Sequence, residues 1–362
     1  MTDRAIEATR QGRSPSIDWR SIRASLLLAP ILALAYPFWL KGFTASVSAI
    51  LSGVGGFGAW AVAATTLIFA FATSGLTLLV AMLLAAMESP TAAQLKARHI
   101  ALLAVAAPTI FVFLGVVLAM LHLPNADTWV WVVAWVAAGV SVALADNRSP
   151  TKFTFTAAPG WLRVAHGISA ACIVVMFLSL HIPNHLFFIE GQTEYMVVMK
   201  LFRHVYREAV IQPIIVALLL FQVVSGSYLG TRRASAPLDR FQTFQLASGT
   251  FLAFYILGHM NSVFIYARTY LGIDTDWGFA TGAPAGLIKD PWNIRLVPHY
   301  GLAIFFVLAH LLSGLRVIML AHGLQKTIAD WVMIGGTVVA AAIACVIMLG
   351  MSGVRVSFVL PN

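Results

Sequence analysis

The sequence predicts an all-α, polytopic membrane protein built as a bundle of transmembrane helices. Hydrophobic residues make up 60% of the 362-residue chain and charged residues only 10%, whereas about a quarter of a typical soluble protein is charged. The mean hydropathy is +0.86. Apolar runs long enough to cross a bilayer recur along the whole chain. Together these observations exclude an ordinary soluble domain.

The apolar runs define the expected helices in order. A helix needs about 20 apolar residues to cross the hydrocarbon core. The first run follows an arginine-bearing stretch and shows no small-residue cleavage site, so we expect a retained helix rather than a signal peptide. We predict about nine transmembrane helices, near residues 22–45, 57–87, 98–122, 128–146, 161–189, 197–230, 241–268, 297–321 and 327–351.

The distribution of lysine and arginine predicts the orientation. With the N-terminus in the cytoplasm and the C-terminus outside, most of the 23 basic residues fall in cytoplasmic segments, as the positive-inside rule requires. The net charge of +9 is then explained by this excess and by contact with anionic membrane lipids. We therefore expect a multi-pass protein of a bacterial inner (plasma) membrane, and no nucleic-acid partner.

A polar linker divides the chain into two regions. The sequence DNRSPTKFTFTAAP is threonine-rich and bounded by prolines, which is typical of a loop. We predict a four-helix region over residues 1–146, a cytoplasmic linker over 147–160 and a five-helix region over 161–362. A weak similarity of residues 95–115 to 238–258 places Val116 where the second region has His259. The first region is then either a degenerate repeat without that histidine or similar only in composition.

Two histidines of the second region, His181 and His259, fall at the same predicted depth. Each follows the cytoplasmic start of its helix, at Arg163 or Phe241, by the same number of residues, which corresponds to about 27 Å along the axis. An unpartnered imidazole is costly in hydrocarbon, and binding to haem iron satisfies one ring nitrogen. We predict one bis-histidine haem b toward the outer face, with hydrogen bonding to a neighbouring helix as the alternative for each residue.

Other polar residues form three further candidate groups. His310 lies toward the inner side, where the sixth helix offers Gln222, and a hydrogen bond between them is favoured over a second haem. At the outer end, His185, His204 and Arg207 are candidates for contacts with haem propionates, with snorkelling side chains as the alternative. The candidates for a quinone or polar pocket are Arg163, His166 and Ser169 at the inner end and His299 at the outer end.

Four segments of the second region carry a family resemblance. LRVAHGISAACIVVMFLSLHIPNHLFFIEG resembles the first helix of the five-helix cytochrome b membrane subunit of succinate dehydrogenases and fumarate reductases. The matching positions there are His166, His181 and Asn184. Ser248 and Gly249 followed by His259 are similar to the third-helix ligand motif, and HLLSGL, which begins at His310, to the fourth-helix motif. FQVVSGSYL lies where the second-helix ligand is expected and offers Gln222 instead.

The resemblance covers roughly residues 161–351 and implies that His181 and His259 bind the haem distal to the cytoplasm. It also implies that half of the proximal ligand pair is missing, which puts the usual anchoring of a flavoprotein and an iron–sulfur protein in doubt. We expect a b-type cytochrome that relays electrons between a quinone pool and a redox or flavoprotein partner, rather than a stand-alone catalyst. The alternative is a non-catalytic membrane anchor or a haem- or redox-sensing scaffold.

Overall fold

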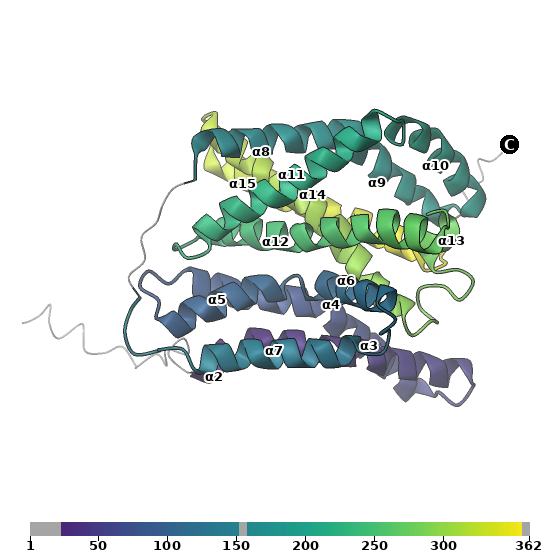
Figure 1. The fold of residues 1–362 in the computed structure, drawn as a ribbon, viewed down its shortest axis with the longest axis horizontal. Helices are drawn as coiled ribbons and strands as arrows, with labels where there is room; N and C mark the ends of the chain where they lie inside the picture. The colour runs from purple at the N-terminus through teal and green to yellow at the C-terminus, as the bar shows by residue number, and fades with distance from the viewer. Residues whose placement is uncertain (1–22, 152–157, 357–362) are drawn as a thin grey trace, which may run out of the picture.

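The computed structural model describes residues 23–151 and 158–356, and every regular element in these ranges is a helix. The helices of the first region, in purple and blue, lie together beside those of the second region, in teal, green and yellow (Figure 1). The first region comprises α2 Arg23–Leu26, α3 Leu28–Leu51, α4 Phe57–Ala85, α5 Ala92–Ala104, α6 Ala107–Met120 and α7 Asp127–Ala143.

The second region is a bundle of five long helical segments with short helices between them. Its elements are α8 Gly160–Ile173, η2 Val174–Leu178, α9 Ser179–Leu186, η3 Phe187–Ile189, α10 Gln192–Tyr206, α11 Ile211–Arg233, α12 Arg240–Met260, η4 Asn261–Leu271, α13 Trp277–Thr281, η5 Asn293–Arg295, α14 Leu296–Ala321 and α15 Lys326–Met351. Part of the predicted linker, residues 152–157, lies outside the described residues.

The structure confirms long apolar helices of transmembrane length, but not the predicted number of about nine. Among the described residues, seven helices are long and apolar enough to span a membrane, or eight if α5 and α6 form one bent span. The 17-residue α7 is shorter than these. The bend between α5 and α6 is 67° and has a local cause, since Pro108 lies in the first turn of α6 and has no amide hydrogen to donate to the preceding turn. Ser74 Oγ donates to the carbonyl of Val105 at the break, which satisfies a buried acceptor.

The predicted run over residues 197–230 is not one helix. It is divided between α10 and α11. Arg203, His204 and Arg207 fall at the end of α10, where Glu208 accepts hydrogen bonds from the amides of Val210 and Ile211 at the start of α11. Charged side chains are costly in hydrocarbon, so α10 lies apart from the spanning part of α11. This break places its cationic side chains at the end of the bundle.

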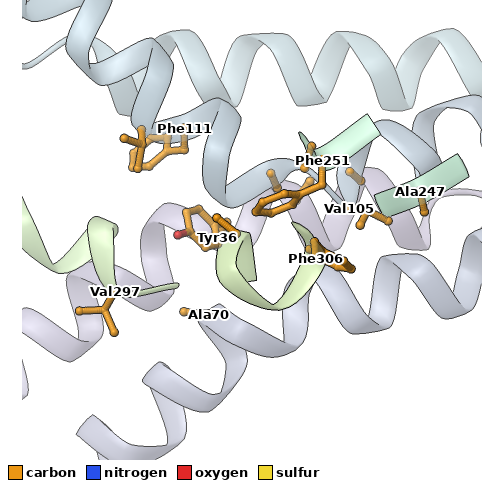
Figure 2. Packing of buried hydrophobic residues seen from close by; sticks show 14 of the residues in the cluster. Tyr36, Ala70, Val105, Phe111, Ala247, Phe251, Val297 and Phe306 are labelled. Carbon is orange, nitrogen blue, oxygen red and sulfur yellow. The ribbon is translucent and has the colours of Figure 1, made fainter. Parts of the chain in front are cut away.

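The two regions share one apolar core. Phe251 and Ala247 of α12 and Phe306 of α14 pack beside Val105 and Tyr36 of the first region (Figure 2), and the ring centroids of Phe251 and Phe306 are 4.8 Å apart. The segments of the weak internal similarity differ in shape, since α12 is one continuous helix and α5 and α6 are bent. The repeat therefore stays a hypothesis.

Two buried polar contacts stabilise the interface between the first and second regions. Arg98 is fully buried and donates to the carbonyls of Leu84 and Met87 in its own region and of Ser235 and Ala236 in the other. A second contact is the ion pair between Arg295 Nη1 and Asp127 Oδ2, at 2.7 Å with both side chains buried. The first region thereby holds α12 and α14 in place.

Candidate functional site

A cavity of about 1810 Å³ runs along the second region between α8, α9, α11, α12 and α14. The histidines that line it are His166, His181, His185, His259 and His310, with His99 from the first region. Each helix contributes a mostly apolar face, so the polar atoms in this cavity are few and specific. Ligand sites in membrane bundles are built in this way.

One helical segment presents histidines at both ends of the cavity. The π-helical segment η2 lies between His166 of α8 and His181 of α9. The fifteen-residue spacing of the two histidines is close to four turns of an α-helix. Both side chains therefore line the same cavity. We name its two ends after these residues, the His166 end and the His181 end.

At the His181 end, His181 faces His259 across the cavity. The ring centroids are 6.3 Å apart and the ring planes make an angle of 66°. Phe177 stacks on His181 at 4.5 Å and Tyr255 stacks on His259 at 5.3 Å, so each imidazole is held by an aromatic ring of its own helix. The equal depth of the two histidines predicts that they lie close together, but not the two aromatic rings, which lie one helical turn before each histidine.

His185 lies beside this pair. Its Nε2 is 3.2 Å from Nε2 of His181, and its ring stacks on Phe188. The Nδ1 atoms of His181 and His185 and the Oδ1 atom of Asn184 are buried without a hydrogen-bond partner in the described structure. Buried polar atoms without a hydrogen-bond partner are rare and destabilise a fold. At this end of the cavity they are nitrogen and oxygen atoms that can bind a ligand.

Three arginines surround the same end of the cavity. Arg203 donates to the carbonyl of Thr275 and Arg207 donates to Thr275 Oγ1 at 2.7 Å, while Arg268 lies 4.8 Å from the Phe264 ring. In the part of the chain that the structure describes, no carboxylate forms an ion pair with them. Burial, and then the charges of Arg203 and Arg268, lower the pKa of Arg207 to about 10. The group stays positive at neutral pH and attracts anions.

Two residues predicted for the site at the outer end, His204 and His299, do not line the cavity. His204 is exposed and belongs to a separate shallow pocket of about 440 Å³ beside Lys200, so it is not part of the cavity. His299 is buried against Tyr255 and Tyr300, and is not among the residues that line the cavity. Its Nδ1 has no hydrogen-bond partner among the described residues.

At the His166 end, the predicted hydrogen bond between Gln222 and His310 is absent. Gln222 Nε2 instead donates to the carbonyl of His166 and to Ser169 Oγ, at 2.7 and 2.5 Å, and His310 pairs with Ser248. The predicted bond to His310 was wrong because the side chain of Gln222 faces α8. The position of a residue along α11 does not show which neighbouring helix it faces.

The predicted polar pocket of Arg163, His166 and Ser169 is only partly formed. Arg163 is exposed and lines the cavity together with His166. Ser169 is buried and its oxygen accepts from Gln222. Within residues 23–151 and 158–356, no group of three or more histidine, cysteine, aspartate or glutamate side chains is placed to hold a bare metal ion.

Comparison with known proteins gives no match to any family model, curated protein or solved structure.

Proposed function

We propose that this chain is a membrane-embedded b-type cytochrome of a bacterial inner membrane. In this proposal His181 and His259 bind one haem iron from opposite sides, and the protein relays electrons between a quinone pool and a redox partner. The single observation that carries the proposal is the facing pair of imidazoles in an apolar cavity. When bound, a haem with two imidazole ligands supplies one-electron transfer and has no open position for oxygen.

The separation of the two rings fits this ligand. A metal–imidazole bond is about 2 Å long, so two imidazoles on opposite sides of one metal atom have ring centres roughly 6 Å apart. The centroids of His181 and His259 are 6.3 Å apart. Phe177 and Tyr255 stack on these rings and restrict their rotation. The two imidazoles therefore lose little conformational freedom when a ligand binds.

The remaining polar groups at the His181 end suit the rest of a haem. Arg203, Arg207 and Arg268 provide positive charge and form no ion pair with a carboxylate among the described residues. Guanidinium groups bind carboxylates such as propionates through charge-assisted hydrogen bonds. His185 shares a hydrogen bond with Nε2 of His181. In this proposal His181 would hold the haem through that nitrogen, and His185 would be a neighbour of the haem rather than its ligand.

Absorption spectra of the purified chain, oxidised and dithionite-reduced, test the proposal. We expect a reduced α-band of b-type haem that is lost in His181→Ala and in His259→Ala. The matched control is His322→Ala, because His322 is exposed and bonds only to the carbonyl of Ile318. A well-folded wild-type chain that takes up no haem contradicts the proposal.

A second candidate is a non-catalytic membrane anchor or scaffold. One observation favours it: from the first region, only His99, Leu102 and Leu103 line the cavity, although that region packs along α12 and α14. Most of the first region is thus not needed to enclose the site and is available to hold a partner subunit. A colourless chain that co-purifies with a second protein supports this function over the first.

A further inference from the structure

The helix α10 carries a stripe of aliphatic side chains that the described parts of the chain leave uncovered. This helix lies at the end of the bundle, beside α9 and the start of α11 (Figure 1). One face packs into the bundle through Tyr195 and Met199, which are both buried. Val197, Leu201 and Val205 recur every four residues and are 65%, 66% and 44% exposed. Side chains four residues apart lie along one side of a helix, so these three form a continuous apolar stripe.

The length of α10 indicates where this stripe lies relative to the membrane. The helix has 15 residues and is therefore about 22 Å long, which is too short to cross a hydrocarbon core of about 30 Å. A short helix at the end of a transmembrane bundle is expected at the boundary between lipid and water. Helices with an apolar stripe bordered by cations are typical of this layer, where the apolar side chains enter the acyl region.

Two cationic side chains border the stripe. Lys200 and His204 are exposed and line the shallow pocket of about 440 Å³ at the end of α10, together with Arg203 and Arg207. Lys200 forms no ion pair within the described residues. Both arginines are held in place, because each donates to Thr275. Donors for an anion therefore lie directly beside an apolar surface.

The acidic residues nearby do not neutralise this group. The carboxylate in the shallow pocket, that of Glu208, accepts hydrogen bonds from the amides of Val210 and Ile211 at 2.8 and 3.1 Å. Glu194 belongs to the first turn of α10, about 15 Å along the axis from His204. Positive charge consequently predominates over the last two turns of the helix.

We propose that α10 lies in the headgroup layer of the membrane and forms a binding site for an anionic phospholipid. Lys200 and His204 bind the lipid phosphate, and its acyl chains pack on Val197, Leu201 and Val205. Cations next to a membrane attract acidic lipids electrostatically. In the predicted orientation this end of the bundle is outside, where the positive-inside rule calls for no excess of basic residues. A bound anion therefore accounts for the group better than topology does.

Lipid-specific quenching of a fluorescent label tests the proposal. A bimane is attached to Leu201→Cys in the full chain, after the native Cys172 and Cys345 are replaced by serine. The vesicles contain equal amounts of phosphatidylcholine and phosphatidylglycerol, and only one of the two has brominated chains. We expect stronger quenching by brominated phosphatidylglycerol. In Lys200→Gln this preference should fall about five-fold, since one cation near the surface is lost, and His204→Gln should lower it as well.

A second label position is the matched control. Val338 in the middle of α15 is 66% exposed, and a bimane on Val338→Cys should be quenched equally by the two lipids. Inorganic phosphate, added at constant ionic strength, should leave the preference at Leu201 unchanged.

Three results would overturn the proposal. Quenching at Leu201 by neither lipid means that water, a second copy or another protein covers the stripe. Equal quenching by both lipids that is the same in Lys200→Gln means that α10 enters the bilayer without selecting an anionic headgroup. A preference abolished by inorganic phosphate means that the site binds the free anion. These measurements need no bound haem, so their outcome is independent of the proposed function.

Discussion

The imidazole rings of His181 and His259 face each other across an apolar cavity with their centroids 6.3 Å apart. They come from helices that are far apart in the sequence, and each ring is stacked on an aromatic side chain of its own helix. Preorganisation of this kind lowers the ordering cost of binding.

His185 is predicted to be dispensable for haem binding. It lies next to His181 but stacks on Phe188, so we expect His185→Ala to keep the b-type α-band and His181→Ala to lose it. Removing His185 also removes the hydrogen bond that competes with iron binding. Spectrophotometric haem titration of the two variants measures the difference, and loss of the α-band only in His185→Ala would make His185 the ligand.

Arg207→Gln is predicted to lower the midpoint potential of the haem at the His181 end. Positive charge near a haem favours the reduced form, because reduction adds a negative charge, and its loss costs on the order of tens of millivolts. Potentiometric titration measures the shift, and added salt should reduce it. Lys200→Gln is the matched control, since Lys200 does not line the cavity. Equal midpoint potentials in the wild type and Arg207→Gln would show that the arginine charge does not act on the haem.

The same arginine predicts a pH dependence. The folded pKa of Arg207 is lowered to about 10 from an ordinary value of 12.5, so the side chain stays charged from pH 6 to 9 and its effect on the potential is constant there. Between pH 10 and 12.5 the unfolded chain binds more protons than the folded chain, and the contribution of this group to stability rises with pH. A midpoint difference between wild type and Arg207→Gln that disappears below pH 9 contradicts this assignment.

The ion pair between Asp127 and Arg295 is predicted to hold the first region to the second. Asp127→Ala leaves a buried guanidinium without its partner, and such losses cost about 3–5 kcal/mol. We expect a lower thermal unfolding midpoint in detergent for Asp127→Ala, and partial recovery in Asp127→Ala/Arg295→Met. The control Asp330→Ala breaks the more exposed ion pair to Arg316 and should cost less. Equal losses in the two single variants would contradict a role specific to this interface.

Gly350 is predicted to be required for the packing of α15 on η3. A Cβ atom there would lie 2.5 Å from the amide nitrogen of Ile189 and 2.6 Å from the carbonyl carbon of Phe188, which are backbone atoms that cannot rotate away. We expect Gly350→Ala to cost about 1–3 kcal/mol. Gly335→Ala meets open space and should be neutral or stabilising. Thermal unfolding of the two variants compares them, and equal midpoints would show that η3 can shift.

Much of the fold could be predicted from hydropathy, because long apolar runs have few alternatives to a transmembrane helix. The bend before Pro108 and the break near Arg207 were missed, since both depend on local hydrogen bonds and charge within apolar stretches. At the site, the depth of His181 and His259 could be counted from the sequence. The partners of Gln222, His166 and His310 could not, because they depend on which helices are neighbours in the bundle.

The reduced-minus-oxidised absorption spectrum of the purified wild-type chain, measured beside His181→Ala and His259→Ala, shows whether these two histidines bind a haem. We expect a b-type α-band in the wild type and its loss in both variants, with the folded helical content unchanged. A folded wild-type chain without an α-band, or both variants with undiminished bands, would contradict this assignment.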